Sequence, residues 1–307
     1  MNKKQIKNIG ASVLAKLLKM SREQNLDFNR LLMLYLQEGF LHRLSISQYK
    51  ELFILKGGVL LYSTYLEKAR PTKDVDFLVQ NLSNQLDEFL QVIKRIVSIN
   101  IKDGIFFKSS TIKVTRIIKA ADYPGLRTII PAQIDTAQQR LQVDVGFGNI
   151  SATTPIQLKY PRLLESKSIS ITAYSWETVV SEKFESIVRF GEINSRIKDF
   201  HDLNFLIQHH CFKGKELKES IQETFNNCNT DITESSYIFS DSFLNDKQKQ
   251  RQWISFLQKF ESDSLSEFVD VMENIMKFLD PVVQAIVEKK SFDYVWDTNK
   301  INWKKCD

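Results

Sequence analysis

Glycine and proline are scarce in this 307-residue chain, which has 10 glycines and 6 prolines. Since both residues favour turns and interrupt helices, their scarcity favours a helix-rich architecture. No apolar run approaches the ~18 residues of a membrane-spanning helix, so no membrane association is expected. Hydrophobic residues make up 43% of the chain and charged residues 26%, which is the composition of an ordinary globular protein with a sizeable core.

Cysteine is also rare, and its few copies argue against a disulfide framework. Cys211, Cys228 and Cys306 are odd in number, and no pair has zinc-ligand spacing, so we expect reduced thiols in a reducing compartment. The basic N-terminus resembles the start of a signal peptide, but Lys16 and Lys19 interrupt its apolar stretch. A cytoplasmic location is therefore predicted. The net charge of +5 suits a protein that meets a polyanion transiently, although many other proteins share it.

The first 174 residues mix strand and helix patterns. Apolar residues at helical spacing predict two helices within residues 3–44, with Asp27 or Asn25 capping the second, and further helices at 59–67 and 86–99. Apolar or alternating runs predict strands at 53–56, 75–79, 111–118, 127–134 and 141–147, with 168–173 as a further candidate. We expect a mixed sheet of roughly five strands with flanking helices.

After residue 174 the strand patterns largely stop. Ser175 can cap a helix over 177–191, and a second helix is predicted over 196–209. Residues 226–246 are rich in Asn, Thr, Ser and Asp and indicate a loop or linker. Amphipathic helices are expected at 247–261, 265–278 and 281–290, with Pro281 separating the last two. The predicted fold class is α+β, with an α/β domain over residues 1–174 and a helical domain over 175–307.

Asp74 and Asp76 are the first candidates for chemistry. Two positions apart in a strand, their side chains point to one face of the sheet. Asp76 interrupts the apolar run VDFLV, where an unpaired charge would be costly to bury. Asp144 repeats this pattern in LQVDVGFG. Three acids on adjacent strands offer Mg²⁺ the oxygen ligands that it prefers, so we predict a divalent metal site. The alternative for an acid pair alone is a solvated strand end.

A glycine pair, Gly57-Gly58, stands between the strand at 53–56 and the helix that follows. Glycine allows a phosphate to approach the backbone closely, and the N–H groups at a helix N-terminus bind phosphate. Lys56 would add positive charge at this point. Thr72, in register with the two aspartates, can donate its hydroxyl to a phosphate. The pattern predicts a triphosphate site, with an ordinary turn as the alternative.

A second group of candidates lies in EKFESIVRFGEINSRIKDFHDL. Lys183 lies at the edge of an apolar helical face, and Asp199 and Asp202 share one face of the next helix. A lysine that faces two carboxylates can be an inter-helix salt bridge and nothing more. The functional interpretation places Lys183 on a triphosphate, with Asp199 orienting it or acting as a base. Arg196 and Asp202 are then further candidates for binding the nucleotide.

Three ordered segments carry a resemblance to a known family. They are KGGVLLYSTY…ARPTKDVDF, LQVDVGFG and EKFESIVRFGEINSRIKDFHDL. Together they resemble the AbiEii/AbiGii toxin family of nucleotidyltransferases, over about residues 10–210. The resemblance implies a fold similar to the DNA polymerase β-like nucleotidyltransferases. It implies a mixed sheet with flanking helices, and a helical C-terminal domain that completes the active-site cleft.

The resemblance also implies site residues. Asp74 and Asp76 match the family's metal-binding pair, and Thr72 matches the hydroxyl beside it. Gly57-Gly58 stand where these enzymes have Gly-Gly or Gly-Ser before the triphosphate, and Asp144 matches a third acid more loosely.

The lysine–aspartate segment matches a second part of the family's site. Lys183 matches the essential lysine, and Asp199 matches the late catalytic aspartate. No family motif is recognisable in residues 211–307.

The implied activity is Mg²⁺-dependent or Mn²⁺-dependent transfer of nucleotides from an NTP to an RNA acceptor, in some members the 3′ end of tRNA. Family members act as toxins paired with a cognate antitoxin protein, and some are linked to abortive infection in phage defence. Nucleotidyl or phosphoryl transfer to a protein target is an alternative within enzymes. A catalytically silent module that binds nucleotide or RNA is an alternative of another class, although three intact acids argue against it.

Overall fold

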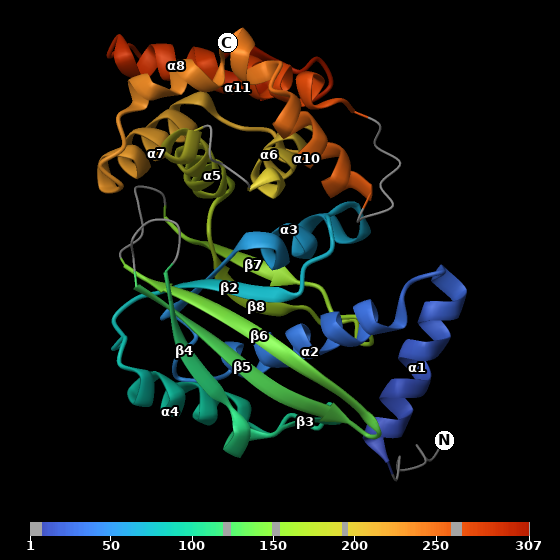
Figure 1. The fold of residues 1–307 in the computed structure, drawn as a ribbon. Coiled ribbons are helices and arrows are strands. Elements are labelled where there is room, and N and C mark those ends of the chain that lie inside the picture. Colours follow the sequence, from blue (N-terminus) through green and yellow to red (C-terminus); the bar gives the residue numbers. More distant parts are fainter. Residues whose placement is uncertain (1–7, 119–123, 149–153, 192–195, 259–265, 307) are drawn as a thin grey trace. The chain divides into compact units, whose positions relative to one another are not determined.

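The structure, a computed structural model, describes residues 8–118, 124–148, 154–191, 196–258 and 266–306. The chain divides into two compact units. Residues 1–149 and 155–174 form the N-terminal unit, and residues 150–154 and 175–307 form the C-terminal unit. The large sheet belongs to the N-terminal unit (Figure 1).

The sheet has eight strands within the described residues, where roughly five were predicted. They are β1 (Phe53–Lys56), β2 (Asp74–Val79), β3 (Ile105–Phe107), β4 (Lys113–Ile118), β5 (Pro124–Ile134), β6 (Ala137–Phe147), β7 (Ile156–Tyr160) and β8 (Ile169–Ala173). Their order is β3-β5-β6-β2-β1-β8-β7, with β4 also pairing with β5. The prediction missed β3 and β7, because β3 has only three residues and β7 is polar at alternate positions.

Four helices of the N-terminal unit surround this sheet within the described part. They are α1 (Ile9–Gln24), α2 (Phe28–Ser45), α3 (Gly57–Tyr65) and α4 (Leu86–Val97), with 3₁₀ turns at Leu66–Lys68 and Ser109–Thr111. The predicted cap of α2 is confirmed, because the Asp27 carboxylate accepts a hydrogen bond from the Arg30 N–H at 2.8 Å. The α+β class is likewise confirmed.

An aromatic cluster joins helices and sheet on one side of β2. Phe53 and Phe77 meet edge-to-face with ring centroids 5.4 Å apart, and Phe40 of α2 and Phe89 of α4 each lie 6.2 Å from this pair. All four side chains are buried. Since neighbouring strand residues point to opposite faces, burial of Phe77 directs Asp76 to the other side of the sheet. The hydrophobic core thus fixes which face carries the acids.

Buried ion pairs attach α2 to the rest of the unit. The guanidinium of Arg43 contacts both carboxylate oxygens of Asp103 at 2.6 and 3.0 Å, and the two side chains are 4% and 5% exposed. Glu38, whose pKa is raised by burial, accepts hydrogen bonds from Arg162 at 2.9 Å and from the Leu163 N–H at 2.8 Å. Such pairs hold a helix in one position, because separating them leaves a buried charge.

The C-terminal unit is mainly helical. Its elements are α5 (Trp176–Phe190), α6 (Ile197–His209), α7 (Gly214–Asn227), a 3₁₀ turn (Ile232–Glu234), α8 (Ser235–Ile238), α9 (Asp241–Leu244), α10 (Lys247–Leu257), α11 (Phe268–Val287), β9 (Tyr294–Asp297) and β10 (Asn302–Lys305). Ser175 caps α5 as predicted, accepting a hydrogen bond from the Thr178 N–H at 3.2 Å. Among the described helices of both units, none is long and apolar enough to cross a membrane.

Pro281 does not separate two helices, contrary to the prediction. It lies inside α11, which runs unbroken from Phe268 to Val287. Phe278, Leu279, Val282 and Val283 are buried on both sides of the proline. The helix continues because breaking it there would expose this apolar stripe, which outweighs one lost backbone hydrogen bond.

The C-terminal unit differs from the sequence analysis at two further places. Residues 226–246 are not a plain loop, since they contain the 3₁₀ turn and the short helices α8 and α9. The hairpin of β9 and β10 was not foreseen. It forms around Trp296, which is fully buried and donates its indole N–H to the Ile207 carbonyl at 2.7 Å. Tertiary burial of an aromatic residue, which local patterns do not report, creates this hairpin.

We expect Asp103→Asn to lower the free energy of unfolding by about 3–5 kcal/mol, because it leaves the buried Arg43 charge without a counter-charge. Urea unfolding followed by circular dichroism measures this. The control is Glu51→Gln, which removes an exposed partner 3.8 Å from Lys50 and should change stability by less than about 1 kcal/mol. Equal stability of Asp103→Asn and the wild type would contradict the anchoring role of this pair.

Candidate active site

Three carboxylates converge on one face of the N-terminal sheet. Asp74, Asp76 and Asp144 each offer an oxygen, and these oxygens lie within 4.8 Å of one another. We call this cluster the acid triad. Asp74 and Asp76 are half-buried, and Asp144 is 3% exposed. The sequence prediction named all three residues, and the structure brings them together.

Strand pairing explains the convergence. β2 and β6 run parallel with Asp76 directly opposite Asp144. Directly opposed residues share a face of the sheet, with Cβ atoms ~5 Å apart. Asp74 lies on the same face because it is two residues from Asp76. The aromatic core on the opposite face fixes this orientation, since shifting β2 by one residue would bury the acids.

The start of α3 lies against the acid triad. Gly57 has φ +72°, and a Cβ atom there would lie 2.7 Å from Oδ2 of Asp76. At Gly58 a Cβ atom would lie 2.8 Å from both Cβ and Oγ1 of Thr72. Only glycine permits this close approach at both positions. The N-terminus of α3 therefore lies next to the carboxylates. Its N-cap residue, Lys56, makes no side-chain capping hydrogen bond.

Thr72 and Lys56 flank this junction. The Thr72 hydroxyl lies 3.2 Å from both Oδ1 and the backbone carbonyl of Asp74. Lys56 pairs with Asp76 across β1 and β2. Its ammonium lies 3.4 Å from the Tyr174 hydroxyl and 5.0 Å from the centroid of that ring. The predicted phosphate-binding residues are therefore grouped beside the acid triad.

Arg127 of β5 is a site residue that the sequence prediction missed. It lies opposite Asp144 in the β5–β6 hairpin and donates Nε to Oδ1 at 3.0 Å and Nη2 to Oδ2 at 2.7 Å. These hydrogen bonds raise the pKa of the guanidinium, so it stays charged. The sequence could have indicated this contact, because the predicted strands 127–134 and 141–147 can form a hairpin. Once the register of that hairpin is known, Arg127 lies beside Asp144.

The lysine–aspartate group of the sequence forms a cluster within the C-terminal unit. Lys183 of α5 lies 2.9 Å from Oδ1 of Asp199 and 2.7 Å from Oδ2 of Asp202, both on α6. Nε of Arg196 lies 2.7 Å from Oδ2 of Asp199. Lys183 is 11% exposed, and the two aspartates are each 1% exposed. The structure thus contains the inter-helix salt bridge that was one of the two interpretations.

This cluster contributes to folding whether or not it also acts on a substrate. Removing Lys183 would take away the cation that the two buried carboxylates share, a change that costs about 3–5 kcal/mol. Loss of activity in a Lys183 variant could therefore result from lower stability as well as from altered chemistry.

The acid triad suits a divalent cation. Its donors are carboxylate oxygens, the ligands that Mg²⁺ and Mn²⁺ prefer. Three like charges so close repel one another, and the contact of Arg127 with Asp144 offsets part of that repulsion. The residues of this cluster therefore fit a bound metal ion.

The family described as "Nucleotidyl transferase AbiEii toxin, Type IV TA system" matches residues 39–289, which include the acid triad and the Lys183 cluster. The chain belongs to the AbiEii family. It is therefore a nucleotidyltransferase and the toxin of a type IV toxin–antitoxin system, and this class of system implies an antitoxin partner.

Two solved structures from Helicobacter pylori are similar to this AbiEii protein. JHP933 is 12% identical with a TM-score of 0.49, over 85% of this chain and 94% of its own. A protein described as a "putative nucleotidyltransferase" is 14% identical with a TM-score of 0.49, over 87% of this chain and 100% of its own. No curated protein matches the chain.

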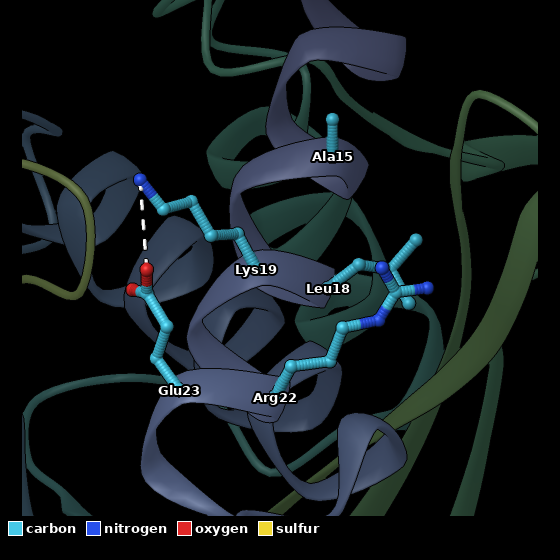
Figure 2. A pocket seen from close by; sticks show the side chains of 5 residues that line it. All are labelled: Ala15, Leu18, Lys19, Arg22 and Glu23. Atoms are coloured by element: carbon cyan, nitrogen blue, oxygen red, sulfur yellow. Dashed lines mark ion pairs between the residues drawn. The ribbon is translucent and has the colours of Figure 1, made fainter.

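A surface pocket on α1 lies outside the acid triad. Figure 2 shows the side chains that line it, and the dashed line marks the ion pair of Lys19 and Glu23 at 3.6 Å. The other lining residues are Ala15, Leu18 and Arg22. Both ion-pair partners are largely exposed, and the lining brings no group of metal ligands together. This pocket offers no chemistry comparable to that of the acid triad.

We expect Arg127→Gln to tighten Mn²⁺ binding at least about tenfold, because a unit charge at ~4 Å opposes a divalent ion by ~2 kcal/mol even in water. Isothermal titration calorimetry on the full chain measures this without catalysis. The matched control is Arg140→Gln on β6, four residues from Asp144, which should leave the affinity within about twofold, since exposed charges beyond ~10 Å are screened. Weaker Mn²⁺ binding by Arg127→Gln would show instead that the arginine holds Asp144 ready for the metal.

Proposed function

We propose that this AbiEii enzyme transfers nucleotides from an NTP to an RNA acceptor, with the 3′ end of tRNA as the target, and that it requires Mg²⁺. The observation that carries the proposal is the convergence of three carboxylates at the start of a helix whose first two residues are glycine. Carboxylates provide a metal site, and the helix N-terminus provides a site for phosphate. A nucleotidyltransferase needs both, side by side.

In this proposal Asp74 and Asp76 hold the metal ion, and Asp144 completes the site. Mg²⁺, or Mn²⁺ in its place, would supply charge for the triphosphate and lower the pKa of the attacking hydroxyl. Thr72 keeps Asp74 in place through its hydroxyl. Arg127 holds both oxygens of Asp144 and offsets part of the repulsion among the three acids.

The triphosphate is proposed to bind at the start of α3. Gly57 and Gly58 keep this backbone accessible, and the helix dipole favours negative charge there. Lys56 adds a positive charge one residue earlier. A side chain at either glycine would strike Asp76 or Thr72, so the same two residues shape the phosphate site and allow the acids to come close.

Lys183 is proposed to neutralise triphosphate charge, as the family resemblance implies. Within the C-terminal unit the two aspartates hold its ammonium group in one place, which supports a positioning role for Asp199 and Asp202. Arg196, ion-paired with Asp199, is proposed as a further phosphate contact.

The biological proposal follows from the chemistry. Extending the 3′ end of a tRNA prevents its aminoacylation and blocks translation, which is an effective action for a toxin. We propose that the enzyme acts in the cytoplasm, that a cognate antitoxin restrains it, and that the pair serves in phage defence.

The test is a labelling experiment. The full chain is incubated with each radiolabelled NTP, Mg²⁺ and either total cellular RNA or total protein. RNA should become labelled, with a tRNA-sized band, and Asp74→Asn should reduce the rate by roughly 10²–10³-fold, because a bound metal contributes several kcal/mol to the transition state. The matched control is Asp87→Asn, which removes an exposed carboxylate on α4 and should leave labelling unchanged.

Three results would contradict the proposal. Labelled protein with unlabelled RNA would favour transfer to a protein side chain. Full growth toxicity of the Asp74→Asn variant would favour a silent binding module. Undiminished RNA labelling by Asp74→Asn would remove the acid triad from the chemistry.

A further inference from the structure

The N-terminal sheet has an apolar side and a polar side. On β6, Leu141, Val143 and Val145 point to the core and are fully buried. The residues between them point to the side of the acid triad, where Gln142 is half-buried and Arg140 is exposed. Figure 1 shows β5 and β6 as long neighbouring strands, with β4 beside β5. A polar face on an antiparallel sheet of this kind meets solvent or a partner.

Strand register defines the residues of this polar side. Between β6 and β5, Asp144 lies opposite Arg127, Gln142 opposite Ile129, and Gln138 opposite Gln133. On the far side of β5, Ile129 lies opposite Lys113 of β4, and Gln133 lies opposite Phe106 of β3. Directly opposed residues share a face. We call this surface the open face, and its principal residues are Phe106, Lys113, Arg127, Ile129, Arg140 and Gln142.

The open face is positively charged and also carries an exposed aromatic ring. Lys113 and Arg140 are exposed, and neither has an ion-pair partner among the described residues. Phe106 is 64% exposed, although large aromatic side chains are usually well buried. Beyond the acid triad, the principal residues of the open face include no acid.

Charge is also divided unevenly along the chain. Residues 1–174 contain 25 Lys and Arg against 14 Asp and Glu, a net charge of +11. Residues 175–307 contain 17 against 23, a net charge of −6. The total of +5 therefore hides a strongly basic N-terminal part. Such asymmetry between the parts of a chain indicates a polyanionic partner for the basic part.

The open face leads away from the acid triad. Arg127 contacts Asp144 directly. Arg140 lies four residues further along β6, a distance of ~13 Å, and Phe106 lies level with Gln138, ~20 Å from the acids. This span matches a few nucleotides of an extended strand whose end would lie at the acid triad.

We infer that the open face binds the single-stranded end of the RNA acceptor, an inference that rests on the proposed function. Lys113 and Arg140 contact backbone phosphates, and Phe106 provides a ring on which a base stacks. Single-stranded nucleic acids are bound in this way, by cations along the backbone and aromatic rings under the bases. The 3′ end of the strand lies nearest Arg127, beside the carboxylates.

The charge pattern favours RNA over a protein partner for this face. Protein interfaces are depleted in lysine and have an apolar centre, whereas on the open face Lys113, Arg140 and Gln142 surround the single aliphatic side chain of Ile129 named above. Lys113 and Arg140, which have no ion-pair partner among the described residues, suit a chain of phosphates, since each contact releases condensed counterions.

The experiment measures binding of a fluorescent single-stranded RNA of about 12 nucleotides, a length within known site sizes, to the full chain. Fluorescence anisotropy is recorded at several salt concentrations without NTP, so that binding does not depend on catalysis. The double variant Lys113→Gln/Arg140→Gln should bind roughly 10- to 25-fold more weakly at ~0.1 M salt, and the slope of log affinity against log salt should fall by about 1.4.

The matched control is Lys159→Gln/Lys167→Gln. It removes two exposed cations from the same unit, on β7 and in the segment between β7 and β8, at the other end of the sheet from β3. Its RNA affinity should stay within about threefold of the wild type, because net charge alone acts weakly through salt screening.

Phe106→Ala separates stacking from charge. It should weaken RNA binding at least about fivefold, because base stacking on an aromatic ring is lost. The salt slope should stay unchanged, since no cation is removed. A nonspecific effect of changing the surface would not lower the RNA affinity while leaving the salt slope unchanged.

The outcomes distinguish this inference from the proposed function. Unchanged RNA binding by the double variant, or an equal loss in the control, would overturn the open face as the acceptor site even if RNA is labelled by the enzyme. Retained RNA binding together with lost binding of the purified antitoxin would assign the face to that protein instead. Failure of the enzyme to label RNA at all would refute the proposed function. The labelling experiment tests that function separately from the binding experiment, which tests the open face.

Discussion

Repulsion among three carboxylates is the constraint on which the N-terminal unit depends. Oxygens of Asp74, Asp76 and Asp144 lie within 4.8 Å of one another, and like charges at this separation oppose folding unless cations or hydrogen bonds offset them. Arg127 takes both oxygens of Asp144, and Thr72 donates to Asp74. The carboxylate oxygens gathered here are the ligands that a divalent cation prefers. A bound cation would offset the repulsion among them.

The core on the opposite side of the sheet makes this cluster possible. Phe53 and Phe77 are completely buried, and they hold β2 in the one register that keeps its aspartates away from the core. Gly57 then allows α3 to start against Asp76. The junction of β1 and α3 therefore depends on the packing of the aromatic core, on the conformational freedom of Gly57 and on the charges of the acid triad.

Sequence patterns could predict the features that depend on neighbouring residues. The caps Asp27 and Ser175 are set within three residues of each helix start, and the strand alternation around Asp74 and Asp76 is local as well. Arg127 was missed because its contact with Asp144 depends on the register of a long hairpin. The hairpin around Trp296 and the unbroken helix at Pro281 depend on tertiary burial, which no local pattern reports.

The most direct test of the account is the position of a metal ion. The full chain is crystallised with Mn²⁺ and a non-hydrolysable NTP, and the metal is located by its anomalous scattering. The account predicts a Mn²⁺ ion about 2.1 Å from carboxylate oxygens of Asp74 and Asp76, with the triphosphate at the start of α3. A metal and triphosphate bound elsewhere, with no contact to Asp74 or Asp76, would contradict it.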